Sequence, residues 1–325
     1  MGDGPVKQYR DAHATRRTTL ATDPISMNAL RTHMDRFFLR WPFADAVLKG
    51  LGQIMLQGDR LTGLFFLVGL FVGGLHFGAA ALMATVAGTL TARLLRFSPA
   101  DVQAGLYGFS AALVGVALVL VFQGTTLIWA MVVAGGVLAA MLQHIFIRRQ
   151  LPGYTFPFVL ITWVFIFVLH QFPGAAEAAP AAMDTAGPSS MLLWGAKSYG
   201  QVIFQGNTWS GILFFLGVLV ASPRAALLGL AAAYAGSAVA LALGEPDAAV
   251  QSGLFGFNAL LTAIAFSGEE GQGKRWLFIA VLITLALHFG LLASGWLAPF
   301  GGVFTFPFVA GCWLTLVLGR MTAAR

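Results

Sequence analysis

The sequence predicts an all-α polytopic membrane protein made of two inverted-topology repeats, each with five transmembrane helices and one re-entrant half-helix. The first observation behind this prediction is composition, because 58% of the 325 residues are hydrophobic and only 10% are charged. A soluble domain carries about 25% charged residues, so this chain has too little polar surface to cover a water-soluble globule. The second observation is an internal repeat, and the third is an odd number of expected crossings in each half.

Three short motifs occur twice in the same order, which indicates a duplicated chain. Segments 105–109 and 253–257 both read Gly-Leu-aromatic-Gly-Phe and lie 148 residues apart. Two further pairs keep nearly the same offset: the Gly-Gln pairs 52–53 and 200–201, and the Thr-Phe-Pro-Phe motifs 155–158 and 305–308.

Apolar runs divide each half into six segments, since a helix needs about 20 apolar residues to cross the hydrocarbon core. In the first half they cover roughly 42–57, 62–79, 80–96, 103–119, 123–147 and 155–170. In the second half they cover roughly 189–205, 210–226, 227–243, 251–265, 275–294 and 303–319.

The fourth segment of each half carries the glycine-aromatic motif, whose glycines weaken a continuous helix. In the second half it has only about 15 apolar residues between charged ends, too few for a normal span. We expect it to be a re-entrant half-helix, which is tolerated where protein or water surrounds it. Five crossings per half place the second repeat upside down relative to the first.

The net charge of +6 comes from basic residues at the chain ends and between apolar runs. Such a distribution is typical of cytoplasmic loops, so we expect an integral plasma (inner) membrane protein with both termini in the cytoplasm. The expected order is a cytoplasmic N-terminal tail 1–40, a first repeat 41–170, an extracytoplasmic connector 171–188 and a second repeat 189–325. The single cysteine, Cys312, excludes a disulfide within the chain.

The repeated residues point to a passage for a small, flat, neutral solute. We expect Asp and Glu only in tails and connections, so no carboxylate relay would couple transport to ions. Glutamine amides offer donors and acceptors, aromatic and leucyl side chains form a narrow slot, and threonine hydroxyls before a proline add polar edges. The residues concerned are Gln53, Phe109, Leu113 and Thr155 in the first half and Gln201, Phe257, Leu261 and Thr305 in the second.

Each of these residues also has a structural interpretation. Glycine-aromatic pairs can simply allow tight helix packing, a threonine at a helix start can be an N-cap, and a glutamine near a helix end can be interfacial. His76, His144 and His288 lie in or near the expected spans, and a histidine pair would suggest an ammonia conductor. His144 and His288 are not related by the repeat shift, so interior or interfacial positions are the simpler interpretation.

At these motifs the chain resembles the urea transporter family, and a bacterial member of it. The matching residues are Gly52-Gln53, 105–109 followed by Leu113-Val114-Gly115, Leu151-Pro152 and 155–158, with their second copies, so the resemblance covers about 42–320. It implies a homotrimer with one pore in each protomer, through which urea diffuses without an energy source.

The resemblance also implies roles for residues. Gln53 and Phe109 would form an outer urea site, and Gln201, Phe204 and Phe257 an inner one. Leu113, Leu261, Thr155 and Thr305 would line the constriction between them. The family's aromatic residue three positions after the first glutamine is Leu56 here, and its asparagine after the motif is Ser110 in the first copy and Asn258 in the second. A slot with one aromatic wall would bind urea more weakly or admit substituted amides.

Other functions stay open from the residues alone. The chain could be an ammonia or small-amide channel, or a non-conducting membrane scaffold. The expected spans show no spacing of a catalytic triad, paired carboxylates or metal ligands, so we expect no enzyme and no cofactor. The lipid bilayer is an expected partner and nucleic acid is not.

Overall fold

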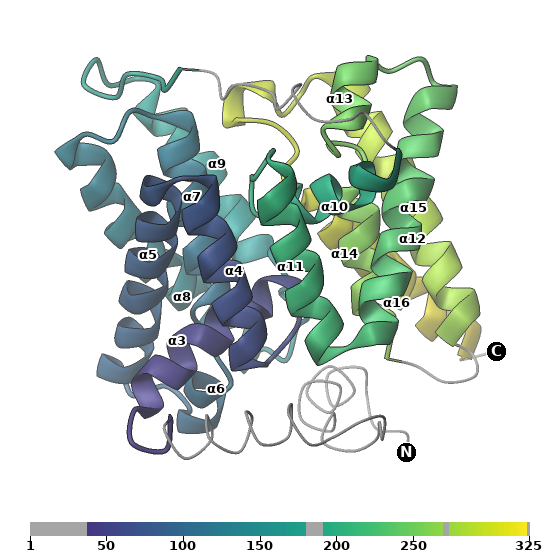
Figure 1. Ribbon diagram of the computed structural model, residues 1–325. Helices are drawn as coiled ribbons and strands as arrows, with labels where there is room; N and C mark the ends of the chain where they lie inside the picture. Colours follow the sequence, from purple (N-terminus) through teal and green to yellow (C-terminus); the bar gives the residue numbers. More distant parts are fainter. Residues whose placement is uncertain (1–37, 180–190, 269–272, 324–325) are drawn as a thin grey trace.

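The computed structural model describes residues 38–179, 191–268 and 273–323 (Figure 1). Within them the fold is all-α, with one isolated β-bridge between Phe122 and Glu177 and no strand. The expected N-terminal tail, apart from 38–40, and the connector beyond 179 lie outside the described residues.

The same order of elements occurs twice along the chain. The first half contains α3 (Pro42–Gly52), η1 (Gln53–Met55), α4 (Arg60–Gly73), α5 (Leu75–Leu94), α6 (Pro99–Gln103), α7 (Phe109–Val121), α8 (Thr126–Arg148) and α9 (Phe156–Leu169). The second half contains α10 (Met191–Gln201), α11 (Thr208–Ala221), α12 (Pro223–Ala242), α13 (Asp247–Gln251), α14 (Phe257–Ala265), α15 (Gly273–Ser294), η2 (Ala298–Phe300) and α16 (Phe306–Ala323).

Among the described residues, α5, α8, α12 and α15 are long and apolar enough to cross a membrane. The inward faces of α5 and α12 carry only glycine, alanine, serine and threonine, and such small side chains let membrane helices approach closely. Large apolar side chains stay exposed on α8, among them Leu138, Met141 and Ile145. An apolar exterior over a small-residue interior suits a helix bundle in lipid.

The first expected span, 42–57, is corrected by the structure. Helix α3 has 11 residues, so at 1.5 Å per residue it extends about 16 Å, roughly half of the hydrocarbon core. Leu56 adopts a left-handed conformation with φ 61°, and the chain then enters α4 at an angle of 78° to α3 and η1. Helix α10 also has 11 residues, so 189–205 is short in the same way.

The fourth segment of each half, which we expected to be a re-entrant half-helix, is divided into several parts. It consists of a five-residue helix, a set of turns and a second helix, which is 13 residues long in α7 and 9 in α14. A sharp bend that the sequence analysis did not predict lies between α3 and α4. Residues 57–60 (Gln-Gly-Asp-Arg) separate the expected segments 42–57 and 62–79, so the sequence marks the break but not the angle between the two helices.

The two halves meet through reciprocal contacts. Thr62 of α4 donates to the Gly217 carbonyl at 2.7 Å, and Ser210 of α11 donates to the Gly69 carbonyl at 2.6 Å. These four positions are related by the 148-residue shift, so each half uses the same surface, as in a two-fold interface. Helices α4 and α11 lie side by side in the middle of the molecule (Figure 1).

A second reciprocal pair joins the last helices of the halves. The indole of Trp163 donates to the Gly302 carbonyl at 2.9 Å, and that of Trp313 donates to the Pro152 carbonyl at 2.7 Å. The 150-residue shift relates these pairs. Helix α6 lies at the end of the molecule where α3 begins and α16 ends, whereas α13 lies at the opposite end (Figure 1).

Candidate functional site

The two repeated glutamines make the same contact in each half. The Gln53 side-chain nitrogen Nε2 donates to the Ala104 carbonyl, and that of Gln201 donates to the Ser252 carbonyl, both at 3.0 Å. Each contact ties the end of a short helix to the residue before the glycine-aromatic motif. A second N–H and the carbonyl oxygen of each amide remain as hydrogen-bonding capacity.

The glycines of the motif act in packing, as the structural interpretation proposed. Gly105 and Gly253 have φ of 78° and 82°, and a Cβ on either would lie 2.4 Å from a backbone nitrogen, of Gly50 or Ser198 respectively. Glycine is therefore required both for the left-handed backbone and for the close approach. The tight contact places the following phenylalanines, Phe109 and Phe257, beside the short helices that carry the glutamines.

Leu56 and Phe204 occupy equivalent left-handed positions, with φ of 61° and 59°. Phe204 packs edge-on against Phe304 with ring centroids 5.8 Å apart and against Phe158 at 5.9 Å. Non-glycine residues seldom adopt this backbone conformation, and its recurrence at one repeat position shows that both short helices end in the same turn.

The second-half residues lie together around a cavity of about 660 Å³. Gln201, Phe204 and Phe257 line it, together with Phe304 and His288. His288 is almost fully buried and its ring meets Phe257 edge-on, with centroids 5.6 Å apart. The repeat identified Gln201 and Phe257, and the resemblance added Phe204. Neither gave His288 a role, because the first half has no histidine at the corresponding position.

The first-half residues are more enclosed than those that line the cavity. Gln53 and Phe109 are each 3% exposed, and Leu56 is half-buried. Helix α7, which Phe109 begins, contacts η1, which Gln53 begins. Because α3 is too short to cross, Gln53 stays toward the end where α3 starts, not at the far face where the expected full span had placed it.

The four residues of the expected middle constriction are buried, and its two threonines contact each other. The hydroxyl oxygens of Thr155 and Thr305 are hydrogen-bonded to each other at 2.6 Å, and both residues are buried. Thr155 makes no capping bond to α9, so its hydroxyl is used across the two halves instead. Leu113 and Leu261 are fully buried in the same core.

Asn258 supports the second half of this constriction. Its amide nitrogen donates to the Phe304 carbonyl at 3.1 Å, and its oxygen accepts from the Phe308 N–H at 3.2 Å. These backbone groups flank Thr305, and Phe304 has a left-handed φ of 45°. Ser110 stands at the equivalent first-half position, and its buried hydroxyl has no hydrogen-bond partner.

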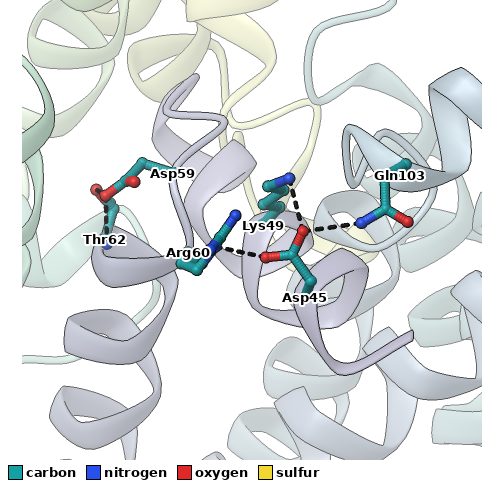
Figure 2. A network of polar contacts seen from close by, with 6 residues as sticks. All are labelled: Asp45, Lys49, Asp59, Arg60, Thr62 and Gln103. Carbon is teal, nitrogen blue, oxygen red and sulfur yellow. Dashed lines mark hydrogen bonds and ion pairs between the residues drawn. The ribbon is translucent and has the colours of Figure 1, made fainter. Parts of the chain in front are cut away.

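One expectation about charge is corrected. Asp45 lies within α3 and is 4% exposed, so a carboxylate does enter an expected span. It is ion-paired with Lys49 and Arg60 (Figure 2), an arrangement that neutralises it locally. Among the described residues no group of three metal-ligating side chains occurs.

The other two histidines named from the sequence, His144 and His76, have local partners or lie at the surface. The His144 nitrogen Nδ1 is 3.1 Å from the Tyr107 hydroxyl, and its ring stacks on Phe97 at 3.5 Å. His76 is exposed at the start of α5. Neither residue joins the groups around Gln53 and Gln201.

The sequence of this chain matches known proteins over most of its length. A family model described as "Urea transporter" matches residues 44–320. "Urea transporter 1" of Rattus norvegicus is 26% identical over 242 residues, covering 70% of this chain and 63% of the relative. "Urea transporter 1" of Ovis aries is 27% identical over the same length and coverage. The chain thus spans less than two thirds of the length of these curated relatives. The match to the family model includes both copies of every motif described above, and the chain belongs to the urea transporter family.

Proposed function

We propose that this protein conducts urea passively across a membrane, through a pore within each protomer and without coupling to ions. The observation that carries the proposal is the cavity at which Gln201, Phe204 and Phe257 meet. It combines aromatic faces with an amide on the rim, and urea is a flat molecule with hydrogen-bonding groups only on its rim. The relatives named urea transporters support the choice of solute.

When urea passes the middle of the pore, hydrogen bonds to urea would replace the bond between the two threonines. A urea molecule entering between Thr155 and Thr305 replaces their mutual bond with one bond to each hydroxyl. Such exchanges are nearly balanced in free energy. Leu113 and Leu261 offer no charge to a desolvated ion, so ions are excluded by the cost of losing their water.

The Gln53, Leu56 and Phe109 group forms the matching site at the other mouth. The reciprocal contacts of Thr62 and Ser210 support two inverted repeats related by an axis in the membrane plane. With both termini in the cytoplasm of an inner membrane, Gln53 faces the cytoplasmic mouth and Gln201 the opposite one. This reverses the sides that the sequence alone implied.

Family resemblance supports a homotrimer in which each protomer carries its own passage. Cross-linking in native membranes, followed by mass determination, measures that state. A monomer that conducts urea would contradict the trimer and leave the pore assignment intact.

Urea flux into proteoliposomes tests the proposal. Stopped-flow light scattering is expected to show urea entry well above protein-free liposomes, inhibited by thiourea. Flux of neither urea nor any amide would favour a non-conducting scaffold.

A second candidate is a channel for small amides, which Leu56 favours because it leaves one wall of the Gln53 site aliphatic. Acetamide and ammonia fluxes measured beside urea separate the two. Acetamide entry faster than urea entry would support the second candidate.

A further inference from the structure

A buried ion-pair cluster stands beside the Gln53 site, and we call Asp45, Lys49, Arg60 and Gln103 the Asp45 cluster. The Lys49 ammonium lies 2.7 Å from the Asp45 carboxylate, and Gln103 donates to the same oxygen at 2.8 Å. Arg60 pairs with the other carboxylate oxygen. Figure 2 shows these three side chains converging on Asp45 from different directions.

The cluster joins the three elements that frame Gln53. Asp45 and Lys49 belong to α3, Arg60 begins α4 after the 78° bend, and Gln103 ends α6. The residue after Gln103 is Ala104, whose carbonyl accepts the Gln53 amide. The Asp45 carboxylate therefore ties the start of α4, just after the bend, and the end of α6, just before the glycine-aromatic motif, to α3.

The second half lacks the charges that make this cluster. By the 148-residue shift, Leu193 replaces Asp45 and Thr208 replaces Arg60, while Lys197 and Gln251 retain the other two residue types. There Lys197 and Gln251 line the open cavity beside Gln201. The mouth with this cluster is enclosed, with Gln53 3% exposed. The mouth at which leucine and threonine stand in place of Asp45 and Arg60 is open, and Glu245 is among the residues that line its cavity.

We propose that Asp45 and Arg60 are positioning residues that draw α3, α4 and α6 together over Gln53, and that this mouth is the narrower one and limits urea flux. The flux part of the inference rests on the proposed function. The structural part, closure over Gln53 by the cluster, does not depend on urea being the solute.

The test is thiol accessibility at equivalent positions of the two mouths. Leu56→Cys and Phe204→Cys are reporters in a Cys312→Ala background, which removes the natural buried cysteine. Each reporter is combined with Asp45→Leu and Arg60→Thr, which give the first half the residues of the second. Modification by a neutral maleimide is measured in proteoliposomes, together with urea flux of the double variant without reporters.

We expect Leu56→Cys to react about tenfold faster in the double variant, because local opening becomes more frequent, and Phe204→Cys to keep its rate. Urea flux per protein should rise. Arg60→Lys keeps the charge and should keep the slow rate. Equal rates at position 56, or equal acceleration of both reporters, would overturn the role of the cluster.

If the double variant does not assemble, Arg60→Gln, which leaves Lys49 to pair with Asp45, allows the same comparison. If the wild-type protein conducts no urea, the proposed function fails while the thiol rates still decide the closure.

Discussion

The hydroxyls of Thr155 and Thr305 meet across the two halves, with their oxygens 2.6 Å apart. Replacing Thr155 with valine leaves the shape unchanged and removes one partner, so Thr305 stays buried and unpaired at a cost of about 1–3 kcal/mol. Urea should also lose a hydrogen bond in the constriction, which slows flux about fivefold. Thermal unfolding in detergent and stopped-flow flux measure the two effects.

The control for this prediction is the double variant Thr155→Val with Thr305→Val. It leaves no unpaired hydroxyl, so its loss of stability should be smaller than the sum of the single losses. Unchanged flux in both single variants would remove these hydroxyls from the passage.

The two mouths differ in one side chain, which is Leu56 in the first half and Phe204 in the second. Leu56→Phe places an aromatic ring where Phe204 stands in the other half, on a backbone of nearly the same φ. An aromatic contact contributes about 0.5–1.5 kcal/mol, so urea should bind up to about tenfold more tightly, measured as half-saturation of flux. Phe204→Leu is the mirror control and should weaken binding. Tighter urea binding in both variants would contradict the proposed aromatic slot.

At the scale of elements, α16 depends on a side chain from α14. Asn258 bridges the Phe304 carbonyl and the Phe308 N–H where the helix cannot yet close its own bonds. Asn258→Ala should cost about 2 kcal/mol or more of unfolding free energy, since two buried backbone groups lose partners. Ser110→Ala is the matched control, because the Ser110 hydroxyl has no partner to lose. Similar shifts in melting temperature for both variants would contradict this account.

The turns before α14 give a second test at this scale. Gly244 and Gly253 have φ of 78° and 82°, but a Cβ on Gly244 would meet nothing within 4 Å while one on Gly253 would lie 2.4 Å from the Ser198 nitrogen. Gly244→Ala should cost only the left-handed backbone strain, about 1–2 kcal/mol. Gly253→Ala should cost about 1–3 kcal/mol more, measured by thermal unfolding. Equal losses would mean that α14 can move away from α10.

At the scale of the whole molecule, the passage should carry no current. Asp45 is paired with Lys49 and Arg60, and the constriction is built from hydroxyl and leucyl groups. Urea flux in proteoliposomes should therefore be the same with and without an imposed sodium gradient, proton gradient or membrane potential. A flux that changes with any of these would indicate coupling and a charged relay that this arrangement does not provide.

The sequence identified the paired motifs but not the path of the chain through them. The resemblance grouped Gln201, Phe204 and Phe257, and all three line one cavity. The boundary after residue 57 was predicted, but α3 was expected to cross the membrane, because apolar composition does not show where a helix stops inside its run. His288 and Asn258 contribute through contacts with distant residues, for which no local pattern exists.

By itself the sequence determined the membrane class, the duplication and the residue types available at each repeat position. Composition and repeated motifs are local properties that can be recognised without a three-dimensional structure. Only the tertiary structure decided that α3 has 11 residues, that Thr155 bonds Thr305 across the halves, and that Asp45 pairs with both Lys49 and Arg60. Those outcomes depend on which distant groups meet, and in a bundle of similar apolar helices the meeting points are fixed by packing and a few buried polar contacts.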